Sequence, residues 1–488
     1  MALSSFRFFR RSSDSADVRQ AQALYRAGML FSAWARHHRA LECYEGALAI
    51  DPGHAGSHYG LGTALSALDR FEEALSCFER ALALQPEFLN ALYGVATSLT
   101  VLARYPEAIA CYDQLLARQP DHTDALFGRG MCYLALGDLP RGLEGFEYSK
   151  QLRDRKRRSL PSPAWRGDAQ LDGKTILLYP DGGLGDAIQF VRYVPMLIEK
   201  GARVIVQVPD KLRALMLGAP FAADAISYGE RLPPHDFHSP MMRLPLVFGT
   251  TLDTIPASRG YLRADTAAVA AWGKRLGPRR RPRIGISWAG NKQNWPYNRR
   301  RSMPLEALQP LGDLDCELIS LQRPLPRQDR AALRAMPHLN RLGESLTDFA
   351  EIAAVIENLD LVIAVDSSIA HLAGSLGKPV WVLLCHPPDW RWFTNRVDSP
   401  WYPTARLFRQ RRPGDWDSVV ADVTAAWRQC ACGSTLEPRA PWDSNVPLEQ
   451  ASIPAVGRVP DRCAQPQAPA ATRRAMLRLR VSRPRSEK

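Results

Sequence analysis

The sequence lacks any apolar run long enough to cross a bilayer. Its longest apolar stretches are short pieces such as Val380–Cys385, whereas a spanning helix needs about 20 apolar residues. Near the start, Phe6–Arg11 is basic and aromatic, but the polar segment Ser12–Asp17 follows where a secretory signal needs its apolar core. We therefore expect no transmembrane segment and no export signal.

The sequence also lacks the cysteine pattern of a disulfide-stabilised or zinc-binding protein. Its nine cysteines are an odd number, and Cys43, Cys77 and Cys111 recur every 34 residues, which is typical of one small buried position in a repeat. Cys430 and Cys432 lie too close for the usual zinc spacing, and no histidine pair follows them. These absences favour a reducing, cytoplasmic location.

Aromatic residues are missing from the basic clusters of the chain. The formal net charge of +13 raises nucleic acid or an anionic surface as partners. The clusters at 153–158, 279–283 and 299–301 carry no interleaved aromatics on which bases could stack. The first two fall between expected domains and are typical of solvated linkers, so we predict no specific nucleic-acid partner.

A repeat of 34 residues is present at the N-terminal end. Pro52, Pro86 and Pro120 mark the period, and further positions of the same frame hold small or aromatic residues. The alanines are Ala40, Ala74 and Ala108, the aromatics Tyr44, Phe78, Tyr112 and Phe146, and the other small residues Gly28, Gly62, Ala96 and Gly130. Small residues let two helices approach, the aromatic fills the space between units, and proline stops the second helix.

Four such units fit residues 21–154, after an N-terminal extension at 1–20. The pattern resembles the tetratricopeptide repeat. That resemblance implies a concave face that holds a protein or peptide, although simple scaffolding stays an alternative. The fourth unit departs most, with Gly142 and Ser149 where earlier units have alanine, and is expected to act as a cap or a joint.

After a proline- and charge-rich linker at 155–171, the pattern changes to that of an α/β protein. Thr175–Tyr179 is an expected strand, followed by a glycine-rich turn that leads to Asp186 and a helix. The strand Arg203–Val208 and the later piece Tyr261–Asp265 are expected to complete a first lobe at 172–275. The turn lacks the third glycine of a dinucleotide site, and the carboxylate of Asp186 would repel a pyrophosphate.

Asp186 has two interpretations. With Gln189 three residues later it resembles a capping box, in which Asp186 caps the helix. At the end of a strand in a cleft, it could also accept a proton from a bound hydroxyl as a general base. The two roles are compatible.

A second lobe is expected at 283–428, beyond the linker Gly277–Pro282. Four apolar runs, each followed by polar residues, predict its strands: Ile284–Trp288, Glu317–Leu321, Leu361–Val365 and Val380–Leu384. A helix is expected at Leu346–Glu357. Two lobes joined by a linker would enclose a cleft.

The stretch that follows Leu361–Val365 is the strongest candidate site. Asp366, Ser367 and Ser368 precede a helical pattern, and the serines can cap its amides, whose positive potential suits a phosphate. His371 would lie about one turn inside that helix. A capped helix with a packed histidine is the alternative on spacing alone.

Six segments in one order resemble glycosyltransferase family nine, the heptosyltransferase-like enzymes, over about 172–428. They are Gly182–Asp186, Ile286–Asn291, Arg301–Leu305, Ser320–Gln322, Asp366–Gly374 and Asp389–Trp392. The resemblance is greatest to a bacterial branch with repeats ahead of the transferase. It implies a fold class of an all-α tetratricopeptide-repeat array followed by a GT-B transferase of two doubly wound α/β lobes.

The resemblance also implies roles for individual residues. Asp186 matches the catalytic base, whereas the second lobe matches the donor site. The implied donor-binding residues are Lys292, Arg301, Gln322, Asp366, Ser367, Ser368 and His371. Either Lys292 or Arg301 would stabilise the departing diphosphate, and the alignment does not choose between them.

Three features depart from the family or compete with it. Ser367 stands where the branch usually has threonine, and Arg243 stands where a small polar residue is expected on the acceptor side. Asp313 and Asp315 superficially resemble a metal-binding pair, but we expect a turn there and predict no metal and no cofactor besides a nucleotide sugar as co-substrate.

The resulting prediction is an inverting, metal-independent glycosyltransferase that moves a sugar from a nucleotide diphosphate to an acceptor, a protein held by the repeats. The alternatives are a lipopolysaccharide heptosyltransferase-like enzyme with a saccharide acceptor and a non-catalytic repeat scaffold. Residues 433–488, rich in proline, alanine and arginine, are predicted to be a disordered basic tail.

Overall fold

The computed structural model of the chain describes residues 5–148, 160–221, 223–257, 260–290, 300–325, 327–342 and 345–431, with side chains from residue 16 onward except that of Arg327. The predicted tail at 433–488 lies outside these residues. All of them belong to one compact unit. Within them, no helix combines the length and the apolar character that a membrane span requires.

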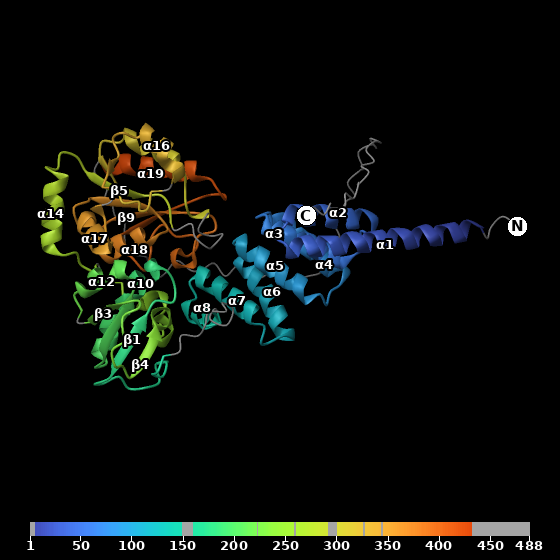
Figure 1. Cartoon of the computed structure of the whole chain (residues 1–488), viewed down its shortest axis with the longest axis horizontal. Coiled ribbons are helices and arrows are strands. Elements are labelled where there is room, and N and C mark those ends of the chain that lie inside the picture. The colour runs from blue at the N-terminus through green and yellow to red at the C-terminus, as the bar shows by residue number, and fades with distance from the viewer. Residues whose placement is uncertain are drawn as a thin grey trace, which may run out of the picture. The chain divides into compact units, whose positions relative to one another are not determined.

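Eight helices make up the described part of the chain before residue 149 (Figure 1). They are α1 (Ser5–Ala33), α2 (His37–Ile50), α3 (Ala55–Ala67), α4 (Phe71–Leu84), α5 (Leu89–Val101), α6 (Tyr105–Arg118), α7 (Thr123–Leu136) and α8 (Leu139–Phe146). Each packs on the next. The predicted proline positions follow the ends of α2, α4 and α6, and α1 begins before the first predicted unit.

The repeating aromatic side chain is enclosed by glycines, as the sequence pattern predicts. A Cβ atom on Gly28, in the same helix pair, would lie 2.7 Å from the ring of Tyr44, and one on Gly60, in the next pair, would lie 2.5 Å from it. Phe78 and Tyr112 meet glycines of the following pair in the same way. Glycine is needed at these positions because the ring takes the volume of a side chain.

The fourth helix pair is closed by backbone rather than by an aromatic ring. A Cβ on Gly145 would lie 2.6 Å from the Cα of Gly130, so α7 and α8 touch main chain to main chain. Glu147, just after α8, pairs with Arg243 of the first α/β lobe, and α8 also packs on α13 (Leu244–Val247). The fourth unit is therefore a joint, and this ion pair accounts for the unexpected arginine at 243.

The first lobe is built on a parallel sheet in the order β3-β2-β1-β4 (Figure 1). Its strands are β1 (Thr175–Tyr179), β2 (Arg203–Val208), β3 (Ala223–Ser227) and β4 (Phe237–Pro240). The helices that follow them include α10 (Leu184–Phe190), η1 (Val191–Tyr193), α11 (Val194–Glu199), α12 (Asp210–Leu217), η2 (Met241–Arg243) and η3 (Leu252–Thr254). β1 and β2 have the predicted bounds, whereas the sequence analysis missed β3 and β4.

The second lobe has a parallel sheet in the order β10-β9-β8-β5-β6-β7. Its strands are β5 (Arg283–Ser287), β6 (Glu317–Ser320), β7 (Asn340–Arg341), β8 (Leu361–Val365), β9 (Val380–Leu384) and β10 (Ala405–Arg409). Its helices are α14 (Thr266–Leu276), η4 (Leu305–Asp313), η5 (Arg327–Asp329), α16 (Arg330–Ala335), α17 (Phe349–Glu357), α18 (Ser368–Ser375), η7 (Trp390–Trp392) and α19 (Trp416–Ala431). The predicted fold class of helical repeats followed by an α/β region is confirmed.

Three predicted segments differ from the structure. Tyr261 donates its backbone N–H to Ser375 of the second lobe, so 261–265 links the lobes instead of forming a strand of the first. α14, which the predicted boundary placed in the first lobe, packs on α17. Trp165, in the predicted linker, is buried because its indole packs near Phe248 of the first lobe.

Candidate functional site

The glycine-rich turn of the first lobe touches the predicted donor helix of the second lobe. Gly185 lies in the first turn of α10, and a Cβ there would lie 2.6 Å from Cδ2 of His371 in α18. Any other residue at 185 would push the two helices apart. The two segments that the sequence singles out therefore form one site.

Asp186 caps α10, but in a different register from the predicted one. The N-cap residue is Gly183, and the Asp186 carboxylate, three residues into the motif, accepts the Gly183 N–H through Oδ2. The predicted partner Gln189 lies buried in the same helix and plays no part in this cap. The carboxylate of a residue at this position can satisfy the free amide of the turn.

Arg391 is the main residue that the sequence analysis missed. Its guanidinium donates from Nη2 to Asp186 Oδ1 at 2.6 Å, from Nη1 to Asp389 Oδ1 at 2.8 Å, and from Nε to Gln189 Oε1 at 3.0 Å. Only 9% of the residue is exposed. Arg391 lies in the segment Asp389–Trp392, which carries part of the family resemblance, but no residue of that segment was predicted to belong to the site.

The charge on Arg391 is balanced by carboxylates from both lobes. Burial acts to lower the pKa of Arg391, but Asp389, Asp186 and also Asp366 outweigh it and raise that pKa. Asp366 follows β8 and is buried, with its Oδ2 3.6 Å from Nη1 of Arg301. Two arginines and three carboxylates therefore share one region, in which Asp366 and Arg391 are buried and the other three side chains are partly buried.

The two serines that begin α18 do not cap it as predicted. Ser367 is the N-cap residue, but its side chain accepts no hydrogen bond from the helix. Its Oγ is buried and has no hydrogen-bond partner among the described residues. The backbone torsions of Ser367, φ −156° and ψ 169°, are extended. The amides at the helix N-terminus are thus left without a side-chain cap, and Ser368 begins the helix itself.

His371 is held as a neutral imidazole. It is 5% exposed, its Nδ1 lies 2.8 Å from the Tyr402 hydroxyl, and its ring stacks on Trp392 with centroids 5.4 Å apart. Burial and then the charge of Arg391 lower the pKa of His371 to about 3. A neutral ring can accept or donate a hydrogen bond but adds no charge for an anion.

Gln322 has a supporting role rather than an open ligand position. Its Oε1 accepts from the backbone N–H groups of Trp288 and Ala289, at 3.1 and 2.9 Å, and from the hydroxyl of Ser287. These contacts hold the turn after β5, which leads toward Arg301. Lys292 lies outside the described residues, so of the two basic candidates the structure places only Arg301.

Two further buried donors lie beside these residues without a partner in the described part of the chain. They are Nε2 of Gln189, whose other amide atom binds Arg391, and Nε1 of Trp392, whose ring stacks on His371. Buried polar groups are nearly always paired, and each unmade bond costs about 1–3 kcal/mol. Together with Ser367 Oγ, they favour a ligand rich in hydrogen-bond acceptors.

A second buried arginine joins the lobes next to this site. Arg192 donates from Nη1 to the Trp401 carbonyl at 2.7 Å, from Nη2 to the Tyr261 hydroxyl at 3.0 Å, and from Nε to the Gln189 carbonyl at 2.7 Å. Its guanidinium also lies 4.8 Å from the Tyr402 ring centroid. The Tyr402 hydroxyl in turn meets His371, so Arg192 supports α18 indirectly.

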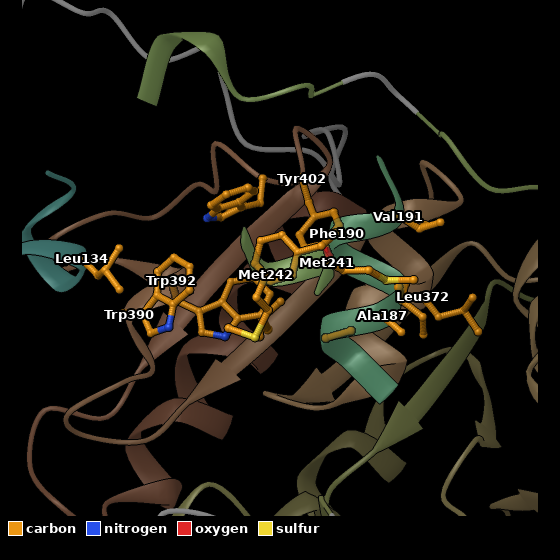
Figure 2. Packing of buried hydrophobic residues seen from close by; sticks show 14 of the residues in the cluster. Leu134, Ala187, Phe190, Val191, Met241, Met242, Leu372, Trp390, Trp392 and Tyr402 are labelled. Atoms are coloured by element: carbon orange, nitrogen blue, oxygen red, sulfur yellow. The ribbon is translucent and has the colours of Figure 1, made fainter. Parts of the chain in front are cut away.

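The last repeat also contacts the segment that carries Arg391. α7 packs on η7, and Figure 2 shows Leu134 of α7 in one cluster with Trp390, Trp392, Met242 and residues of α10 and α18. Thr394 Oγ1 also donates to the Ala135 carbonyl at 3.5 Å. The repeats and the α/β lobes therefore share a continuous apolar core at this point.

The repeats carry a second series of aromatic rings that the sequence analysis missed. Tyr25, Tyr59, Tyr93 and Phe127 occupy equivalent places 34 residues apart on α1, α3, α5 and α7, and all are half-buried. Each packs on the enclosed aromatic of its own helix pair. The first three also meet a ring after the second helix: His54, Phe88 or His122. Equivalent places in a regular stack lie along one side.

The predicted aspartate turn lies away from this site. Asp313 ends η4, and Asp315 precedes β6. Within the described ranges, no group of three or more metal-ligating side chains comes together.

Comparison with known sequences supports both halves of the prediction. Tetratricopeptide repeat models match residues 21–54, 55–88 and 96–149, and the glycosyltransferase family 9 (heptosyltransferase) model matches residues 333–389. The chain thus carries matches to tetratricopeptide repeats in its N-terminal part and to glycosyltransferase family 9 in its C-terminal part. That segment includes Asp366–His371 and ends at Asp389, whereas Asp186 lies outside the matched range.

A curated relative matches more than half of the chain. Protein FlbA of Caulobacter vibrioides is 26% identical over 337 residues, which cover 61% of this chain and 54% of FlbA. The chain thus spans about half the length of this relative.

Solved repeat structures share local likeness with the helical array. YrrB, a repeat protein with an unusual peptide-binding site, is 24% identical over 31% of this chain and 76% of its own, with a TM-score of 0.26. MamA from Desulfovibrio magneticus is 20% identical over 28% of this chain and 76% of its own, also with a TM-score of 0.26. The second repeat domain of human RPAP3 is 21% identical and covers 24% of this chain and 97% of its own, with a TM-score of 0.23.

Proposed function

We propose that this protein is an inverting, metal-independent glycosyltransferase of two lobes in the GT-B arrangement, which uses a nucleotide-diphosphate sugar. The observation that carries the proposal is the contact of the Asp186 turn of one lobe with the N-terminus of α18 of the other. A base on the acceptor side and an anion site on the donor side are the two parts that a single displacement requires.

In this mechanism the acceptor hydroxyl lies beside Asp186. The carboxylate takes the hydroxyl proton while the acceptor oxygen forms a bond to the anomeric carbon of the sugar. The bond from that carbon to the nucleoside diphosphate breaks, and the diphosphate leaves with the electron pair. One displacement at the carbon inverts its configuration.

The departing diphosphate is stabilised by the second lobe. The uncapped amides of α18 and the unpartnered Ser367 Oγ can donate to its oxygens. Arg301 and Arg391 supply positive charge at the same place. Two guanidinium groups and a helix N-terminus take the part that a divalent cation plays in other transferases, so chelation of metals is expected to leave the rate unchanged.

The first test is the loss of the base. A thermal-shift screen of ADP-, GDP- and UDP-sugars on the full chain identifies the donor, and turnover is then measured with Asp186→Asn. We expect donor binding to persist while turnover falls at least about 1,000-fold, because the amide cannot take the proton. Asp398→Asn is the matched control, since Asp398 pairs with Arg396 in a similarly buried ion pair away from this site.

Wild-type turnover in Asp186→Asn would remove Asp186 as the base. Failure of every nucleotide sugar to bind would instead favour the non-catalytic repeat scaffold.

We further propose that the acceptor is a protein segment that lies along the ring series Tyr25, Tyr59, Tyr93 and Phe127. Rings held by neighbouring rings lose little conformational freedom on binding, which suits them to hold an extended peptide. A saccharide acceptor bound only between the lobes would not need them. The ring series therefore distinguishes the hypothesis of a protein acceptor from that of a lipopolysaccharide acceptor.

Point variants test this better than removal of the repeats, because α7 shares its core with the transferase region. The double variant Tyr59→Ala with Tyr93→Ala should raise the KM for the protein acceptor about tenfold or more and leave donor hydrolysis unchanged. Tyr133→Ala, which truncates a half-buried ring outside the series, is the control. An unchanged KM in the double variant would contradict a protein acceptor on these rings.

A further inference from the structure

Arg391 belongs to the second lobe, yet its strongest described contact in the first lobe is with the proposed base. It binds one oxygen of Asp186 while the Gly183 N–H binds the other. Both oxygens of the carboxylate thus have a donor. A carboxylate held in this way is poorly placed to take a proton from an acceptor hydroxyl, because the lone pairs that face these donors cannot also face the hydroxyl.

The same guanidinium lies within electrostatic reach of the donor site. Trp392, the residue after Arg391, stacks on His371 of α18 with ring centroids 5.4 Å apart, and Gly185, the neighbour of Asp186, faces the same ring. The charges of Arg391 and Asp366 also attract each other. The other contacts of Arg391, to Asp389 and Gln189, keep it in place between the lobes. Small movements of its side chain would therefore transfer it from Asp186 toward an anion at the α18 N-terminus.

A diphosphate would compete well for this guanidinium. It carries more charge than one carboxylate, and arginine binds phosphate oxygens through two parallel N–H groups. The carboxylates of Asp186, Asp366 and Asp389 already neutralise the charges of Arg301 and Arg391. An incoming diphosphate would therefore compete with these carboxylates for an arginine, and Asp186 is the one that comes from the other lobe.

We propose that Arg391 is a positioning residue that holds Asp186 while the donor site is empty and turns to the diphosphate of the donor when the site fills. This inference rests on the proposed function. Asp186 becomes free to act as the base only after the donor binds, so the donor binds before the acceptor. Proton removal without a sugar to receive the acceptor oxygen is thereby avoided.

The test is the affinity of the full-length protein for inorganic pyrophosphate, measured by calorimetry. If Asp186 competes with the diphosphate for Arg391, Asp186→Asn should bind pyrophosphate about fivefold more tightly than the wild type, a coupling at the lower end of the usual range. Arg391→Gln should bind it at least about fivefold more weakly. In the double variant the gain from Asp186→Asn should vanish, because the shared arginine is absent.

Asp398→Asn is the matched control and should leave pyrophosphate affinity unchanged. Should Asp186→Asn fail to fold, the comparison of Arg391→Lys with Arg391→Gln still decides: lysine keeps the charge but not the paired N–H groups, so it should restore only part of the affinity.

Unchanged affinity in Asp186→Asn, or a gain that persists in the double variant, would overturn the exchange of Arg391. If Asp186→Asn still loses turnover, the proposed transferase mechanism would stand without that exchange. Conversely, a tighter Asp186→Asn variant that turns over at the wild-type rate would support the competition and remove Asp186 as the base.

Discussion

The interior of the repeat array and the boundary between the two lobes are both closely packed, but by different means. In the repeats, neutral side chains of complementary size meet neighbours that are near in sequence, such as Tyr44 between Gly28 and Gly60. Between the lobes, buried charges meet partners far apart in sequence, as with Arg391 and Asp186. The repeats are therefore stabilised by shape, whereas the lobe boundary depends on paired polar groups that a ligand can rearrange.

The largest effect that this comparison predicts is at Arg192. Arg192→Ala would leave the carbonyls of Trp401 and Gln189 and the Tyr261 hydroxyl without their donor, and would open a cavity between the lobes. We expect a loss of about 4 kcal/mol in the free energy of unfolding, measured by urea denaturation. Arg203→Ala, which removes an exposed arginine of the same lobe, is the control. A loss as small as that of the control would show that the lobe boundary does not depend on its buried charge.

The next largest effect is expected in the last repeat, where α7 and α8 touch main chain to main chain. Gly145→Ala places a methyl group against the backbone of Gly130, which cannot move away without separating α7 from α8. The expected loss is about 3 kcal/mol. Gly46→Ala is the matched control, because its methyl group meets only the flexible end of Leu24 at 3.3 Å, and alanine favours the helix. Equal melting temperatures for Gly145→Ala and Gly46→Ala would show that the backbone contact between α7 and α8 does not stabilise the repeat.

A pH effect of intermediate size is expected at the lobe boundary and not in the repeat interior. The pKa of His371 is about 3 in the folded protein, below its ordinary 6.5. Between these values the unfolded chain binds more protons, so His371 favours the folded state above pH 6.5 and loses this contribution as the pH falls. The loss is about 2 kcal/mol between pH 6 and 4.5. The free energy of unfolding of His371→Gln should fall less over this range. If the free energies of the variant and the wild type fall in parallel with pH, His371 is not the source of the loss.

The smallest effect is expected at the charged surface of the repeats. Arg70 and Glu73 form an exposed pair at 2.6 Å, and Arg104 and Glu107 repeat it in the next unit. Such pairs contribute little because water screens them, so Arg70→Ala should leave the free energy of unfolding nearly unchanged. A loss as large as that of Arg192→Ala, measured under the same denaturation conditions, would mean that charge matters as much in the repeats as between the lobes.

The sequence predicts the periodic and locally encoded parts of the molecule well. β1, β2, β8 and β9 have the predicted bounds, because an apolar run bounded by polar residues specifies a buried parallel strand. The repeat period likewise predicts the helix pairs. β3 and β4 were missed, since their short, partly exposed sequences carry no clear pattern. Asp186 and His371 could be named from motifs, but the contact of Gly185 with His371 that brings their segments together could not.

The sequence by itself determined the repeat array, the two α/β segments and the residue types available for chemistry, because periodicity and local motifs encode them. Only the tertiary structure decided that the Asp186 carboxylate binds the Gly183 N–H, that Ser367 leaves α18 without a side-chain cap and that Arg391 joins Asp186. The last of these depends on which side chain reaches a polar group across the lobe boundary. That choice depends on the packing of segments some 200 residues apart, which no local pattern records.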